Sequence, residues 1–156
     1  MIEERFAGAL TELYLGLKDS GVSWVVTASL NLALHGLPVE VHDIDVLTDE
    51  AGAYEIERRL AQHSVRAVCW RASDRIRSHF GALCLGGVAI DIMGDVETYD
   101  EVTGWQPTPE VASNSEIIEL RGQPIPVRTL EAEHAAYVRL GRAEKAELVQ
   151  RWLECR

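Results

Sequence analysis

The chain of 156 residues has no long apolar run, and no stretch approaches the roughly 20 residues that a membrane-spanning helix needs. It begins Met-Ile-Glu-Glu, without the basic segment and apolar run of a secretory signal peptide. These absences predict a cytoplasmic protein that does not insert into membranes. Internal repeats and long linkers are also lacking, and an apolar content of 47% suits the core of one domain.

Cysteine is scarce. Cys69, Cys84 and Cys155 are far apart, odd in number and without C-x-x-C spacing. Neither a disulfide framework nor a zinc site is therefore indicated.

Basic charge is the third deficit, because the formal net charge is -10. Bulk nucleic-acid binding depends on basic surface that replaces counterions, so it is not expected. A phosphate-bearing substrate remains compatible if a divalent ion neutralises it first. The basic residues are also unevenly spread, since Arg66, Arg71, Arg75 and Arg77 face only one nearby acid, Asp74. That segment is either a solvated loop or a strip facing phosphate or an acceptor.

Residues 24–49, WVVTASLNLALHGLPVEVHDIDVLTD, form the stretch around which the chain is organised. The apolar start predicts a short strand at 24–26. A turn of small residues follows at 27–29, and then a short helix at 30–35. A second strand carries an Asp-x-Asp pattern.

Three aspartates in strand-like segments predict a metal site. Because side chains alternate along a strand, Asp43 and Asp45 share one face, about 7 Å apart. Asp91 lies in the apolar run VAIDIM and can approach from another strand. Magnesium prefers hard oxygen ligands, usually carboxylates together with substrate phosphates. Two ions roughly 3.5–4 Å apart could bridge three carboxylates and a triphosphate, and they would relieve the repulsion among the carboxylates. The expected ion is Mg²⁺, or Mn²⁺.

The turn before the helix supplies a candidate phosphate contact. Free N–H groups at a helix start favour phosphate, and the Ser29 hydroxyl can add one hydrogen bond. Serine is also a common helix cap without any ligand, so this turn alone is weak evidence.

The other elements indicate helices on a small sheet. Apolar spacing predicts helices at 2–19 and 51–62, and the C-terminal residues 130–156 are helical with a division at Gly141. Thr129 is positioned to cap the first of these C-terminal helices.

Strand signals complete the prediction. A strand is expected at 64–70, and residues 71–80 and most of 95–115 are expected to be loop. Gly86-Gly87 suits a two-residue hairpin turn, and Arg121-Gly122-Gln123 separates two further short strands. The sum is an α/β (α+β) fold with a small mixed sheet, flanking helices and C-terminal helices.

Together these features resemble the DNA polymerase β-like nucleotidyltransferase superfamily, and most closely its small bacterial minimal and kanamycin-type members. The family pattern is a small-residue turn, a helix, Asp-x-Asp and a later acid. It falls here on Thr27-Ala28-Ser29, Asp43, Asp45 and Asp91. The Leu-His-Gly run at 34–36 and the segment LGRAEK at 140–145 also look like such proteins.

The resemblance implies a single nucleotidyltransferase-like domain over 1–156, with a catalytic core at about 1–128 and a helical segment at 129–156. It implies transfer of a nucleoside monophosphate from a nucleoside triphosphate such as ATP to an unidentified acceptor, with release of pyrophosphate. All three aspartates would hold metal, and Asp91 would share one ion and accept the acceptor's proton. Ser29 would contact phosphate, and Arg142 and Lys145, on one helix face, would reach the triphosphate.

One departure from the family pattern is Ala28, which stands where the family has glycine. A positive φ there would strain alanine by about 1 kcal/mol or more, and its Cβ could displace the nucleotide. The alternative function is therefore a weak or inactive nucleotide-binding module that acts through a protein partner, as an antitoxin or regulatory subunit would. A homodimer that completes the cleft also stays open.

Two other interpretations compete. A glycosyltransferase that binds manganese through Asp-x-Asp would explain neither the Ser29 turn nor Asp91. The aspartates could also be no more than exposed strand ends, because Asp-x-Asp is common by chance.

Overall fold

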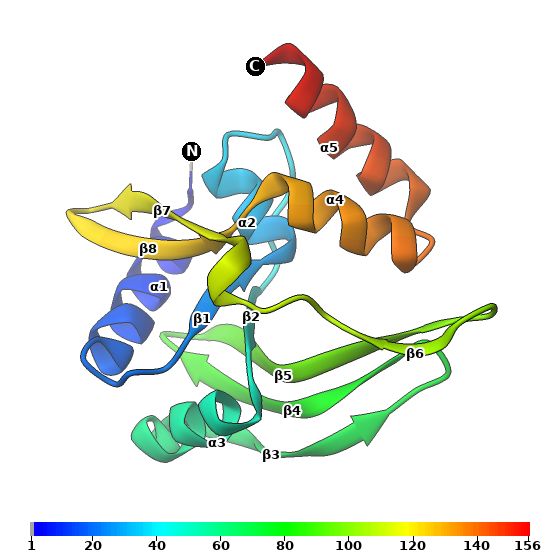
Figure 1. The fold of residues 1–156 in the computed structure, drawn as a ribbon. Helices are drawn as coiled ribbons and strands as arrows, with labels where there is room; N and C mark the ends of the chain where they lie inside the picture. The colour runs from blue at the N-terminus through cyan, green and yellow to red at the C-terminus, as the bar shows by residue number, and fades with distance from the viewer. Residues whose placement is uncertain (1) are drawn as a thin grey trace.

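The computed structural model describes residues 2–156, which contain one mixed sheet of eight strands (Figure 1). The strands are β1 (Trp24–Thr27), β2 (Ile44–Thr48), β3 (Ser64–Ala72), β4 (Ile76–Leu85), β5 (Val88–Asp100), β6 (Gly104–Pro107), β7 (Ser115–Leu120) and β8 (Gln123–Arg128). Their order is β3-β4-β5-β2-β1-β8-β7, with β6 paired to β5. The β2–β5 and β1–β8 pairs are parallel, and the other pairs are antiparallel. The expected mixed α/β fold is confirmed.

Helices flank both faces of this sheet. They are α1 (Glu4–Leu17), α2 (Ala28–Leu34), α3 (Glu50–Arg59), α4 (Leu130–Arg139) and α5 (Ala143–Cys155). In Figure 1, α4 and α5 lie above the strands and α3 lies below them. Within residues 2–156, no helix is both long and apolar enough to cross a bilayer.

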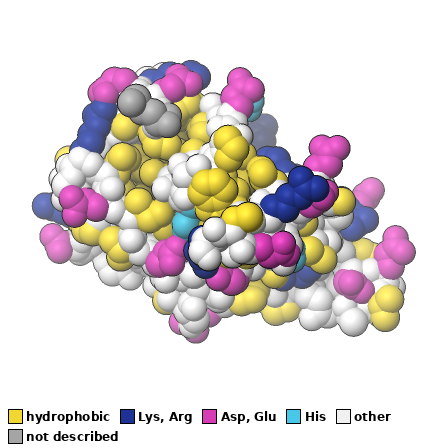
Figure 2. All heavy atoms as spheres, turned by 90° about the horizontal axis from the view of Figure 1, so that it is seen from above, with side chains coloured by type: hydrophobic (Ala, Val, Ile, Leu, Met, Phe, Trp, Pro, Cys, Tyr) yellow, Lys and Arg dark blue, Asp and Glu magenta, His cyan; other side chains and the backbone are white. Residues whose placement is uncertain are grey.

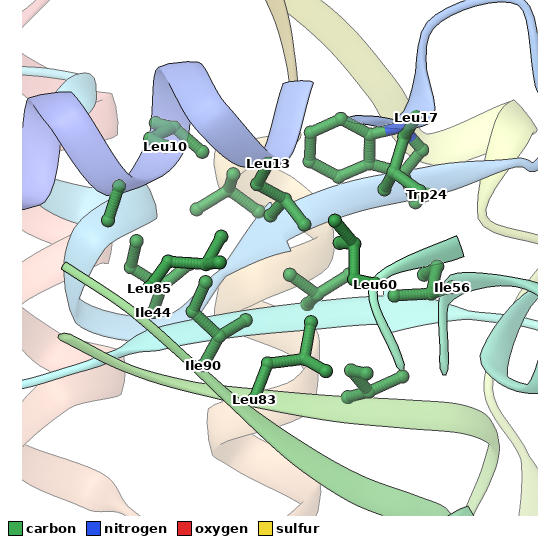
Figure 3. Packing of buried hydrophobic residues seen from close by; sticks show 14 of the residues in the cluster. Leu10, Leu13, Leu17, Trp24, Ile44, Ile56, Leu60, Leu83, Leu85 and Ile90 are labelled. Atoms are coloured by element: carbon green, nitrogen blue, oxygen red, sulfur yellow. The ribbon is translucent and has the colours of Figure 1, made fainter. Parts of the chain in front are cut away.

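The main core lies between the sheet and the two helices α1 and α3. Figure 3 shows Leu10 and Leu13 of α1 next to Ile44, Leu83 and Ile90 of the strands. These residues are almost fully buried, and each such side chain contributes about 1.5–3 kcal/mol. Because strand side chains alternate, burying this face turns the intervening positions of β2 and β5 toward α4.

A second, smaller core fastens the C-terminal helices. Tyr137 of α4 and Val149 of α5 pack with Leu32 of α2 and with Leu37. Thr129 caps α4 as expected, because its side chain accepts a hydrogen bond from the N–H of Ala132. This packing holds α4 above the face of the sheet that the main core leaves uncovered.

Both predicted hairpins are confirmed. Gly86 and Gly87, with φ of 55° and 80°, join β4 to β5, and β7 pairs antiparallel with β8. Gly141, with φ of 72°, separates α4 from α5.

The prediction of a loop at 71–80 is wrong, because β3 and β4 form a hairpin there. Arg71 pairs with Ser78, and Ser73 closes the turn by donating from its N–H to the carbonyl of Ile76 over 2.8 Å. The pairing of polar, basic strands at the sheet edge carries no apolar alternation, so the sequence signal for a strand was weak.

The loop predicted for most of 95–115 is also wrong in its first half. β5 continues to Asp100 and pairs with β6, and the Asp100 side chain accepts hydrogen bonds from the N–H groups of Val102 and Thr103. Arg77 braces this extension through an ion pair with Glu97 at 2.8 Å.

The surface on the side of α5 carries charges of both signs. Figure 2 shows acidic and basic side chains interspersed there, with apolar side chains between them. The net negative charge of the chain is therefore not gathered into one patch on that face.

Candidate active site

A row of paired residues crosses five adjacent strands on the face below α4. Thr27 pairs with Asp45, Asp45 with Asp91, Asp91 with Ala82, and Ala82 with Arg66. Directly paired residues present their side chains on the same face of a sheet. The row therefore places two of the predicted aspartates between the small-residue turn and an arginine.

The three predicted aspartates come together. Asp43 lies just before β2, and one carboxylate oxygen from each of Asp43, Asp45 and Asp91 lies within 4.8 Å of the others. All three side chains are half-buried. Three hard oxygen donors at this spacing match what a divalent cation of the magnesium type binds.

The electrostatics of the cluster agree with this fit. The pKa of Asp45 is raised to about 7, chiefly by burial and then by repulsion from the neighbouring carboxylates of Asp43 and Asp91. Burial and Asp43 also raise the pKa of Asp91, while Arg66 opposes that increase. A bound cation would remove this repulsion, because an opposite charge favours the ionised carboxylate.

Ala28 adopts the conformation that the family glycine would favour. It is the first residue of α2 and has a φ of 58°, in the left-handed region. For a non-glycine residue this costs about 1–2 kcal/mol. The turn therefore keeps a glycine-type backbone but carries a Cβ.

Glu133 of α4 binds this turn. Its side chain is 2% exposed, and Oε1 accepts hydrogen bonds from the Thr27 hydroxyl, from the Ala28 N–H at 2.9 Å and from the Asn31 amide at 3.2 Å. The Asn31 amide also donates to the Arg128 carbonyl at 2.9 Å. A buried carboxylate with several donors is a strong contact, so α4 is held against the turn.

A pocket of about 180 Å³, here called the α4 pocket, adjoins the cluster. It lies between α4 and the sheet, and three arginines border it. Its lining residues are Thr27, Ala28, Asp45, Leu47, Ile76, Met93, Val96, Thr98, Thr108, Arg128, Glu133, Ala136, Tyr137, Arg139, Leu140 and Arg142.

Two groups in the α4 pocket suit a bound polar molecule. Burial lowers the pKa of Arg128, whose side chain is 7% exposed, so an anion nearby would stabilise its charged form. The hydroxyl of Tyr137 is buried and has no hydrogen-bond partner within residues 2–156. Buried hydroxyls usually have a partner, so a ligand or water would satisfy it.

The remaining predicted residues lie at different distances from this pocket. Ala28 and Arg142 line it, whereas Ser29 and Lys145 are not among its lining residues. Arg142 precedes α5, so the expectation that it shares a helix face with Lys145 is wrong. The Lys145 ammonium lies 5.7 Å from the Tyr137 ring.

Sequence reasoning missed four residues of the site: Arg128, Glu133, Tyr137 and Arg139. Each lies in or beside a segment assigned only as helix or strand. An acid at an otherwise apolar helical position was a signal for Glu133, because charged residues are rarely buried unless paired.

The chain matches the sequence model of aminoglycoside-2''-adenylyltransferases over residues 9–150. It belongs to the aminoglycoside-2''-adenylyltransferase family. The superfamily resemblance drawn from the aspartates and the turn is thereby confirmed. Nucleotide transfer is the general type of activity that this family represents.

Solved structures agree with that assignment. The present chain is 44% identical to TM1012 of Thermotoga maritima, a candidate nucleotidyltransferase. The two structures have a TM-score of 0.87 over 100% of this chain and 97% of that one. The antibiotic-resistance factor ANT(2'')-Ia in solution has 10% identity and a TM-score of 0.65, over 97% of this chain and 86% of that one. Its complex with adenylyl-2''-tobramycin has 12% identity and a TM-score of 0.61, over 95% and 89%.

The two ANT(2'')-Ia structures show a shared fold alone. No curated protein matches the chain.

The left-handed conformation of Ala28 predicts that glycine at this position does not destabilise the protein, unlike glycine elsewhere in a helix. Ala28→Gly relieves the left-handed strain but gives the unfolded chain more freedom, so we expect unfolding free energy to stay equal or rise by up to about 1 kcal/mol. Ala33→Gly in the same helix has no such strain to relieve and should lose about 1 kcal/mol. Urea unfolding of both variants measures the contrast, and equal losses would contradict the strain.

The buried hydrogen bonds of Glu133 predict that replacing its carboxylate with an amide lowers the stability of the protein. Glu133→Gln weakens the buried hydrogen bonds to the turn and should lower the free energy of unfolding by about 1–3 kcal/mol. The matched control is Glu131→Gln, because Glu131 is exposed on α4 and pairs with Arg156. That control should change stability by less than about 0.5 kcal/mol. Similar values for the two variants in urea unfolding would argue against the Glu133 contact.

The raised pKa of Asp45 predicts a pH dependence of stability. Its folded-state pKa of about 7 lies above the ordinary value of 3.8, so the folded state binds the extra proton and stability falls as pH rises between these values. With a chelator present, the ionisation of Asp45 should lower the free energy of unfolding of the wild type by about 2–3 kcal/mol between pH 5 and pH 8. Asp45→Asn should remove most of that loss. Urea unfolding at both pH values tests this, and an unchanged pH dependence in the variant would refute it.

Proposed function

We propose that the protein is a divalent-metal-dependent nucleotidyltransferase that moves a nucleoside monophosphate, with ATP as the donor, to a hydroxyl of an acceptor. The observation that carries the proposal is the convergence of Asp43, Asp45 and Asp91 beside a pocket bordered by arginines. The adenylyltransferase family supports an adenylate donor.

The three aspartates are the proposed metal ligands. Their close oxygens and the raised pKa of Asp45 support this role, because burying such a cluster without a cation is costly. Divalent cations bound there would neutralise the triphosphate and polarise the α-phosphoryl group.

Asp91 is also the proposed base. The acceptor oxygen forms a bond to the α-phosphorus, the bond from that phosphorus to the bridging oxygen breaks, and pyrophosphate leaves with the electron pair. The acceptor's proton passes to Asp91 and then to solvent. Burial raises the pKa of Asp91 above its ordinary value, which makes this carboxylate a stronger base than an exposed aspartate and supports this role.

The nucleotide would occupy the α4 pocket. Arg128, Arg139 and Arg142 border it and would bind phosphate oxygens, for which planar guanidinium groups are well suited. The free hydroxyl of Tyr137 supplies a further contact. Ser29 beside the turn and Lys145 in the first turn of α5 are proposed to contact the outer phosphates.

A second candidate is a nucleotide-binding module with weak or no catalysis that acts through a protein partner. The specific observation in its favour is the turn itself. The Ala28 N–H already donates to Glu133, and Ala28 carries a Cβ where phosphate would approach. Both features reduce what the turn can offer to a triphosphate.

Ligand-induced stabilisation tests the proposed function. Binding of Mg²⁺–ATP at 100 times its dissociation constant adds about 2.7 kcal/mol, which corresponds to a rise in Tm of roughly 5–11 °C. We expect this rise in the wild type and its loss in the double variant Asp43→Asn, Asp45→Asn. The matched control is Asp19→Asn, Asp95→Asn, which removes two exposed charges at left-handed positions that asparagine tolerates.

The same samples separate the two candidates. With water as a slow acceptor, the wild type should release AMP and pyrophosphate from ATP faster than an added Asp91→Asn variant does. Binding without such release would favour the non-catalytic module. No metal-dependent rise in Tm with any nucleoside triphosphate would refute a nucleotide site.

A further inference from the structure

A second pocket, of about 370 Å³, opens over β3 and β4, and in the paired row Asp91 lies between Asp45 of the α4 pocket and Arg66 of this pocket. It is here called the arginine pocket, and Arg66, Arg71, Arg77, Ile76, Phe80 and Met93 carry the argument below. Ile76 and Met93 line both this pocket and the α4 pocket, so the two adjoin. Arg66 lies in the paired row that continues through Ala82 to Asp91.

The lining of the arginine pocket combines an apolar floor with positive charge. Ile76, Phe80 and Met93 are half-buried apolar side chains that line the pocket. Arg66 and Arg71 are exposed and make no ion pair over the part of the chain that the structure describes. Arg77 is neutralised by Glu97, and no acidic residue lines the pocket.

The chemistry of transfer assigns this side to the acceptor. In phosphoryl-group transfer, the attacking and leaving oxygens are roughly in line with the phosphorus. If the pyrophosphate leaves toward the α4 pocket, with its three arginines, the acceptor oxygen must approach the α-phosphorus from the side away from that pocket. The arginine pocket extends to the β3 side of the proposed base Asp91, because the paired row places Asp91 between Asp45 of the α4 pocket and Arg66.

We propose that the acceptor is an anionic molecule with an apolar part, whose phosphate or carboxylate binds Arg66 and Arg71 while its hydroxyl points to Asp91. This proposal rests on the proposed function. An acceptor covered with protonated amines, as an aminoglycoside is, would meet like charge in this pocket, and juxtaposed like charges cost several kcal/mol. The acceptor of this chain thus differs in charge from the one in its family's name.

Binding of phenyl phosphate tests the pocket. It combines an apolar ring with a dianion and has no free hydroxyl to be modified. We titrate it by calorimetry into wild-type protein saturated with Mg²⁺ and the non-hydrolysable α,β-methylene analogue of ATP. Arg66→Ala and Arg71→Ala should each weaken binding about three- to tenfold. Arg75→Ala is the matched control, because Arg75 lies in the same hairpin but does not line the pocket.

Two companion ligands complete the calorimetric test. Phenylacetate in place of phenyl phosphate shows whether the pocket prefers a carboxylate or a phosphate. Benzylamine, with the same ring and a positive charge, should not bind. Equal binding of benzylamine and phenyl phosphate, or an equal effect of all three arginine variants, would overturn the proposal.

The outcomes also separate this proposal from the proposed function. If the ATP analogue does not bind but phenyl phosphate does so through Arg66 and Arg71, the anion pocket stands and the nucleotidyltransferase assignment fails. If the two compete, or if Arg66→Ala weakens the analogue itself, the pocket serves the donor and the acceptor proposal is wrong. Pyrophosphate release that saturates with tobramycin as acceptor would also overturn it.

Discussion

Parallel pairing of β2 with β5 is the constraint on which the candidate site depends, because it places Asp45 beside Asp91. The same register sets Ile44 beside Ile90 on the opposite face, where both are fully buried under α1 and α3. Their burial contributes about 3–6 kcal/mol together, which is comparable to the cost of ionising Asp45 in this position. The hydrophobic face of the sheet thus holds carboxylates close together that would otherwise repel each other.

The second organising contact joins the two ends of the chain. Thr27 and Glu133 are 106 residues apart, yet the Glu133 carboxylate binds both the hydroxyl of Thr27 and the N–H of Ala28. Because α4 carries Glu133 and Tyr137 on one face, the same docking closes the α4 pocket and brings its arginines near the aspartates. The C-terminal helices are therefore part of the site, and not a separate covering of the sheet.

Positively charged side chains gather near the candidate site although the chain as a whole is negatively charged. The chain has a net charge of -10, but arginines border the pockets on both sides of the aspartates. Local positive charge can bind anionic groups where the net charge would repel them, and it does so most strongly at sites partly shielded from water. Burial raises the pKa of Asp91 and the charge of Arg66 opposes that increase, so Arg66 acts on the cluster even without a ligand.

Local pattern by itself determined the mixed fold, both hairpins with their glycine turns, and the strand positions of the aspartates, because alternation and turn chemistry act over a few residues. The parallel pairing of β2 with β5 decided that Asp91 lies beside Asp45. Tertiary structure alone decided that residues 71–72 and 76–80 belong to strands, since β3 at the sheet edge pairs with β4 although this segment has no apolar period. It also decided the role of Glu133, whose donors come from a turn distant in sequence. The apolar period of α4 could mark Glu133 as a buried acid, but only the packing of α4 on the sheet could identify its hydrogen-bond donors, because those donors lie in remote segments.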